Sequence, residues 1–71
     1  MELTDREHEV VTNIYGDKPR NLRAVKTEEL VAMHDGVSDA VQLSYEDGDI
    51  ESLGILLPLE TKITRTLHHR L

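Results

Sequence analysis

Histidines and carboxylates are the side chains of this sequence that could do chemistry, and their spacing decides whether they share a metal ion. His68 and His69 are neighbours, and adjacent residues on a helix point about 100° apart, so they do not easily hold one ion together. Neither His8 nor His34 has a second histidine three or four residues away, the spacing that places two ligands on one helical face. We therefore expect no metal site.

The acidic segment "YEDGDIES" at residues 45–52 is the best candidate for a calcium loop. An EF-hand loop needs oxygen ligands at alternating positions, a glycine at the sixth position and a bidentate glutamate at the twelfth. With Asp47 and Asp49 in the third and fifth positions, the sixth is Ile50 and the twelfth is Leu56. The spacing therefore excludes a calcium loop of this kind.

Catalytic signatures are also lacking, because the sequence contains no phosphate-binding glycine loop, nucleophile elbow or two-histidine zinc helix. The 14 carboxylates guarantee some close pairs, but a catalytic pair needs a pocket that separates the two pKa values. A chain of 71 residues rarely builds such a pocket alone. We expect a protein that is not an enzyme, with no catalytic residue, no cofactor and no small-molecule substrate.

The charges fall into blocks along the chain. Residues 27–60 carry nine carboxylates and no lysine or arginine, whereas segments 17–26 and 61–71 each carry a net charge of +3. Blocks of opposite sign favour the selection of a protein partner by electrostatic complementarity. We predict two contact patches, a basic one and an acidic one. The basic patch is Lys18, Arg20, Arg23 and Lys26, and the acidic patch is Glu46, Asp47, Asp49 and Glu51.

The composition indicates a single small domain over residues 1–71. Because the chain has no cysteine, phenylalanine or tryptophan, its core is small and has no disulfide, so we expect a homodimer. No stretch approaches the roughly 20 apolar residues that cross a bilayer. The N-terminus "MELTDREHEV" is acidic, unlike a signal peptide. We expect a cytoplasmic protein with no membrane partner.

Two helices are predicted in the first half of the chain. Thr4 and Glu7 form a capping-box pattern that starts a helix over residues 4–15, which Gly16 ends. After a connection, Thr27 caps a short second helix that Gly36 ends.

The second half predicts a β-hairpin over about residues 39–56. Val41, Leu43 and Tyr45 alternate with polar residues, and the dipeptide Asp47-Gly48 favours a tight turn, with the strand register left open. Pro58 then opens a last helix over about 58–71, on which every fourth residue is apolar, namely Leu59, Ile63, Leu67 and Leu71. The predicted fold is α+β, two or three helices packed on the hairpin. The alternative is an all-α, helix-turn-helix-like domain.

Residues 27–48, "TEELVAMHDGVSDAVQLSYEDG", resemble a helix-turn-helix of the Cro and phage-repressor kind. Gly36–Ser38 would be the turn, and Tyr45–Gly48 resembles the motif that closes the following helix. The resemblance implies binding to duplex DNA. Asp35 and Gln42 depart from the motif, and the segment "SDAVQLSYED" carries three acids and no base.

Duplex DNA is bound largely by neutralising its phosphates with lysine and arginine, so this charge pattern disfavours nucleic acid as the partner. The sequence therefore favours a small acidic, non-enzymatic regulatory or adaptor protein that acts by protein–protein contact, with a protein partner or a second copy of itself. The alternative is a small helix-turn-helix transcription regulator.

Overall fold

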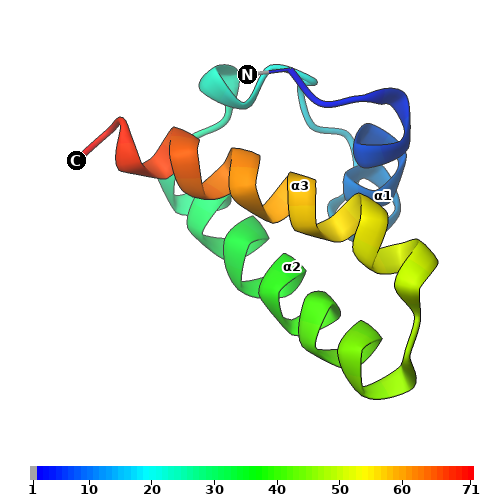
Figure 1. The fold of residues 1–71 in the computed structure, drawn as a ribbon. Coiled ribbons are helices and arrows are strands. Elements are labelled where there is room, and N and C mark those ends of the chain that lie inside the picture. The colour runs from blue at the N-terminus through cyan, green and yellow to red at the C-terminus, as the bar shows by residue number, and fades with distance from the viewer. Residues whose placement is uncertain (1) are drawn as a thin grey trace.

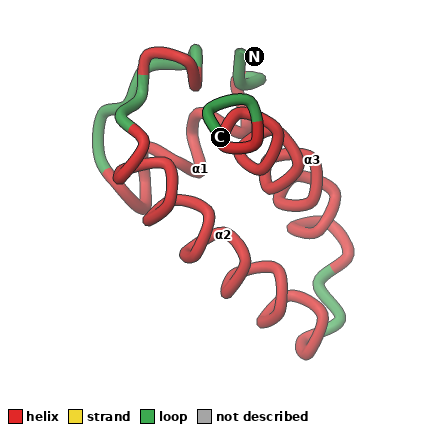
Figure 2. Tube along the Cα trace, turned by 90° about the vertical axis from the view of Figure 1, so that its left-hand side faces the viewer, coloured by secondary structure: helices red, strands yellow, loops and turns green. Residues whose placement is uncertain are grey.

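Helices account for nearly all of the regular structure in the computed structural model, which describes residues 2–71. The elements are α1 (Asp5–Tyr15), the short 3₁₀ helix η1 (Leu22–Ala24), α2 (Thr27–Asp47) and α3 (Ile50–His68). The two long helices α2 and α3 form an antiparallel pair, and α1 lies beside α3 (Figure 1). Figure 2 shows helices and loops and no strand over residues 2–71, and an isolated bridge joins Glu2 to Asn21.

The α+β prediction is wrong, because the segment assigned to a hairpin forms the end of α2 and the start of α3. The three alternating residues, which would share one face of a strand, differ in exposure. Val41 is 8% exposed, whereas Leu43 and Tyr45 are 59% and 62% exposed. The buried residues instead follow helical spacing, at positions 33, 37, 41 and 44 of α2. The all-α alternative describes the fold class correctly.

The predicted start and end of the first helix are confirmed. The Thr4 hydroxyl accepts a hydrogen bond from the Glu7 N–H at 3.2 Å, and the Glu7 carboxylate accepts one from the Thr4 N–H at 2.8 Å. Gly16 follows the helix with a φ of 83°, and its N–H donates to the Thr12 carbonyl at 2.9 Å. Local sequence chemistry is therefore enough to fix both ends of α1.

The Asp47-Gly48-Asp49 segment joins two helices rather than two strands. Gly48 is left-handed with a φ of 68°, and the Asp49 N–H donates to the Ser44 carbonyl at 2.8 Å, which closes α2. Asp49 then caps α3, its carboxylate accepting the Ser52 N–H at 3.1 Å. A glycine C-cap followed directly by an aspartate N-cap reverses the chain within two residues.

Gly36 lies inside α2 and does not end a helix, so that prediction is wrong. The hydroxyl of Tyr15 lies over this glycine and donates to the Ala32 carbonyl at 3.2 Å. A Cβ at position 36 would overlap that hydroxyl. The glycine therefore serves the packing of α1 on α2.

Two further predicted helix boundaries are wrong. Pro58 lies in the interior of α3, where it leaves the carbonyl of Gly54 without a helical donor, and both residues are exposed. Thr27 does not cap α2, because the N-cap position is Lys26, which makes no side-chain cap bond. The Thr27 hydroxyl accepts a hydrogen bond from Arg70 instead, at 3.1 Å.

The core fills the space between the helices and η1. Its fully buried side chains come from all of these elements: Val11, Leu22, Leu30, Met33, Val37, Leu59 and Ile63. The apolar stripe predicted for the last helix is confirmed at Leu59 and Ile63, whereas Leu71 is fully exposed. Of the helices in the described part of the chain, none is both long enough and apolar enough to cross a membrane.

Candidate functional site

The turn between α2 and α3 gathers the predicted acidic patch at one end of the molecule. Glu46 and Asp47 end α2, Asp49 caps α3, and Glu51 lies in the first turn of α3. All four residues are exposed. Hydrogen bonds from the Ser52 hydroxyl and N–H lower the pKa of Asp49 below its ordinary value. This end of the molecule therefore carries a cluster of carboxylate charges.

The four residues of the predicted basic patch have different surroundings. The Lys18 ammonium lies 3.4 Å from the Glu29 carboxylate, and Arg20 pairs with the carboxylate of Asp5. Lys26 is exposed before α2. Arg23 belongs to a different group of cations, at the C-terminal end of α3.

An apolar groove that the sequence did not reveal runs between α1, α2 and α3. It has a volume of about 340 Å³. Its lining residues are Val10, Ile14, Ala40, Leu43, Ser44, Ser52, Ile55 and Leu56. Ile14 and Leu43 are 52% and 59% exposed, so two large apolar side chains lie open to solvent in this groove. Both were assigned to local elements in the sequence, and only the close approach of three helices makes them one surface.

Carboxylates line two hollows that share residues with this groove. Asp39 and Glu46 line a hollow next to Leu43, and three further acids line another hollow beside Ile55. We call these five residues the acidic rim: Glu9, Asp39, Glu46, Asp49 and Glu51. Arg6 is the one cation lining either hollow. The groove therefore combines an apolar floor with a negative border.

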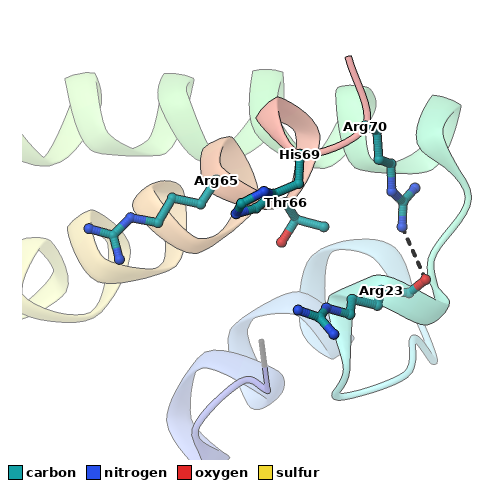
Figure 3. A pocket seen from close by; sticks show the side chains of 5 residues that line it. All are labelled: Arg23, Arg65, Thr66, His69 and Arg70. Atoms are coloured by element: carbon teal, nitrogen blue, oxygen red, sulfur yellow. Dashed lines mark hydrogen bonds between the residues drawn. The ribbon is translucent and has the colours of Figure 1, made fainter.

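The opposite end of the molecule holds a basic pocket of about 320 Å³, drawn in Figure 3. Its lining residues are Arg23 from η1 and Arg65, Thr66, His69 and Arg70 from the end of α3 and the residues after it. No carboxylate lines this pocket. The sequence placed Arg23 with its chain neighbours and gave no sign that the last turn of α3 meets η1.

A buried ion pair between α1 and α3 has a structural role. The Lys62 ammonium donates to the Glu7 carboxylate at 2.6 Å, and the Glu7 side chain is only 4% exposed. Burial by itself raises the pKa of Glu7, but the hydrogen bonds from Lys62 and Thr4 and the charge of Lys62 bring it below its ordinary value. The lowered pKa favours the ionised Glu7 carboxylate, and its contact with Lys62 ties the first turn of α1 to α3.

Metal and duplex-DNA sites have little geometric support. Over residues 2–71, no three histidine, aspartate or glutamate side chains come together in a way that could hold a metal ion. The segment that resembles a helix-turn-helix has no turn, since α2 is continuous through Gly36–Ser38.

Comparisons of the chain with protein-family models, with curated proteins and with solved structures give no match.

Proposed function

We propose that the protein is a small non-enzymatic adaptor or regulator that acts by protein–protein contact, and that its groove receives a basic amphipathic helix of a partner protein. The observation that carries this proposal is the exposure of Ile14 and Leu43 in a groove inside the acidic rim. The proposal keeps the protein–protein contact that the charge blocks favour, but it places the main contact surface in the groove rather than in the two charged patches.

Apolar burial is the source of affinity in this proposal. A helix laid into a groove presents apolar side chains at every third or fourth position, and each one that leaves water contributes about 1.5–3 kcal/mol. The apolar side chains of the docked helix would contact the floor of the groove, to which all three helices contribute. The floor includes Val10, Ile55 and Leu56. An exposed apolar groove with a polar border is typical of interaction sites.

The acidic rim favours a partner helix that carries positive charge. Lysine or arginine on the flanks of the docked helix would face Glu46 on one side of the groove and Asp49 and Glu51 on the other. A symmetric dimer through the same groove would instead bring the acids of two copies together, and juxtaposed like charges oppose association. We therefore favour a different protein over a second copy as the occupant of the groove, and the homodimer stays a separate prediction.

A synthetic peptide tests the groove directly. The probe is an 18-residue helix with leucines on one face and lysines on the other, and its control has glutamate in place of every lysine. We expect fluorescence anisotropy to show binding of the lysine peptide, and at least tenfold weaker binding to the Leu43→Glu variant. The matched control is Val31→Glu, because Val31 is also on α2 and is 46% exposed but does not line the groove.

Equal binding of the lysine peptide to the Leu43→Glu and Val31→Glu variants would contradict the proposal, since attraction by net charge alone gives that result. If the unaltered protein binds the lysine and glutamate peptides equally well, the acidic rim does not select the charge of the partner. The homodimer prediction is tested separately by sedimentation equilibrium. A mass that stays at 8.1 kDa at high protein concentration would show that the homodimer prediction is wrong.

A further inference from the structure

The basic pocket is formed by two segments that are far apart in the chain. Figure 3 shows the Arg23 side chain, from η1, running beneath Thr66 of α3, with His69 just after that helix and Arg70 turned toward η1. Thr66 is 6% exposed, and its hydroxyl donates to the Lys62 carbonyl at 2.8 Å. The pocket therefore has a buried wall and a cationic mouth.

Arg70 holds the two segments together and is itself held in place. One of its terminal nitrogens donates to the carbonyls of Leu22 and Arg23, at 3.2 and 3.1 Å, and the other donates to the Thr27 hydroxyl at 3.1 Å. A guanidinium has five N–H groups, so the Nε–H and one terminal N–H remain for a ligand. An arginine fixed by its other donors is pre-organised for such a contact.

Two other arginines of the pocket have no anionic partner among the described residues. Within residues 2–71, Arg23 and Arg65 take part in none of the ion pairs. Cations near the end of α3 complement the negative end of its dipole, which accounts for Arg65 in structural terms. It does not account for Arg23, which comes from η1 and adds its charge to the same pocket.

We propose that this pocket binds the phosphate group of a small phosphorylated molecule. Arginine is the side chain best suited to phosphate, because its planar fork donates two parallel hydrogen bonds to the phosphate oxygens. A volume of about 320 Å³ lies at the small end of ligand pockets, which span roughly 300–1,000 Å³. It accommodates a phosphate together with a part of the molecule that carries it.

The distribution of charge supports an anion at this position. The chain has a net charge of −6, and a nonspecific anion would be repelled by most of its surface. The pocket is a local exception, with no carboxylate among its lining residues. The site does not depend on the groove at the other end of the molecule, so this proposal and the adaptor proposal can fail independently.

Isothermal titration of the full chain with inorganic phosphate, with adenosine monophosphate and with adenosine tests the proposal. We expect both phosphates to bind and adenosine not to bind. Arg23→Gln and Arg65→Gln should each weaken phosphate binding about tenfold. Arg20→Gln removes the same charge from an exposed arginine outside the pocket and should change the affinity less than twofold.

The relative affinities identify the source of the phosphate. Tighter binding of adenosine monophosphate than of inorganic phosphate supports a phosphorylated small molecule, whereas equal affinity supports the free ion with the same pocket chemistry. The proposal is overturned if Arg23→Gln and Arg65→Gln bind phosphate as well as Arg20→Gln does. It is also overturned if a short DNA duplex binds far more tightly than either phosphate, with a dependence on Arg23, because a nucleic acid is then the ligand.

Discussion

The two ends of the helical pair are built by different interactions. At the basic end, the charged side chain of Arg70, just after α3, makes long-range hydrogen bonds to the carbonyls of η1. At the acidic end, the polar contacts are local, as between Asp49 and Ser52, and Leu43 and Ile50 are left exposed. The first arrangement fixes a pocket of defined shape, and the second leaves an open apolar surface.

This difference indicates how each end could bind. Pre-organised donors favour a small ligand, because little side-chain freedom is lost on binding. An apolar surface with few directional groups tolerates a larger partner and draws its affinity from the area that it buries. We therefore expect the free energy of unfolding to fall when a charged side chain with long-range hydrogen bonds is removed. Replacing one exposed apolar side chain near the acidic end should change it little.

Removing Lys62 should have the largest effect. Lys62→Met leaves the buried Glu7 carboxylate without its cation, and breaking a buried pair in this way costs about 3 kcal/mol of the free energy of unfolding. Lys18→Met is the matched control, because the carboxylate that it leaves behind, that of Glu29, is 42% exposed and can be solvated, so this change should cost less than about 1 kcal/mol. Urea denaturation measures both. Equal losses would show that the buried pair has no special weight, and Lys62→Arg, which keeps the charge, should recover part of the loss.

Acid should weaken the same contact. Because Glu7 has a lower pKa in the folded protein than its ordinary value of 4.5, the unfolded chain takes up the proton first. The stabilisation is complete above pH 4.5 and is lost as the pH falls through the folded-state pKa. We expect the unfolding free energy of the unaltered protein to fall more steeply with acid than that of the Glu7→Gln variant. Parallel pH profiles would contradict this role of Glu7.

A methyl group at two glycines should have opposite effects. Gly36→Ala forces the Tyr15 hydroxyl to move, and such overpacking costs roughly 1–3 kcal/mol even though alanine is the better helix former. Gly54→Ala meets no atom within 4 Å and should stabilise α3 by about 0.5–1 kcal/mol. Thermal unfolding followed by circular dichroism distinguishes the two. If both variants gain stability, Tyr15 does not pack on α2 as described.

Arg70 should matter for stability more than its neighbours in the basic pocket. Arg70→Leu removes the donors to the Leu22 and Arg23 carbonyls and should lower the unfolding free energy by about 1–2 kcal/mol. Arg65→Gln and Arg23→Gln should change it by less than about 0.5 kcal/mol, because within residues 2–71 their guanidinium groups form no ion pair. A large loss in either of these two variants would mean that the pocket is a structural joint rather than a binding site.

Substitutions of exposed apolar residues on α2 should have the smallest effect on stability. Leu43→Glu and Val31→Glu both replace an exposed apolar residue of α2, and each should change the unfolding free energy by less than about 0.5 kcal/mol. Chemical denaturation checks this. A loss above about 1 kcal/mol in Leu43→Glu alone would place Leu43 in the core of the protein rather than on a binding surface.

Local signals in the sequence were sufficient where a helix end depends on neighbouring residues. The capping box of Thr4 and Glu7 and the terminal Gly16 fix α1, and the spacing of Leu59 and Ile63 identifies the buried side of α3. The ends of α1 are satisfied within a few residues, and the apolar spacing of α3 depends only on the period of one helix.

The hairpin prediction failed because two periods fit the same residues. Val41 belongs both to the alternation with Leu43 and to the helical series that begins at Met33, and packing against α3 selects the second. Gly36 resembled a helix end because the residue that requires a glycine there, Tyr15, lies on another helix and could not be identified from the local sequence. The groove and the basic pocket were not predictable for the same reason, since each is formed only when distant segments meet.

One nuclear magnetic resonance titration tests the central claim, that the two ends are separate sites. A ¹⁵N-labelled sample receives the leucine–lysine peptide and then inorganic phosphate. The structure predicts that the peptide shifts amides near Ile14, Leu43 and Ile55, and that phosphate shifts amides near Arg23 and His69, with no overlap between the two sets. A single set of amides responding to both probes, or shifts spread evenly over the chain, would contradict it.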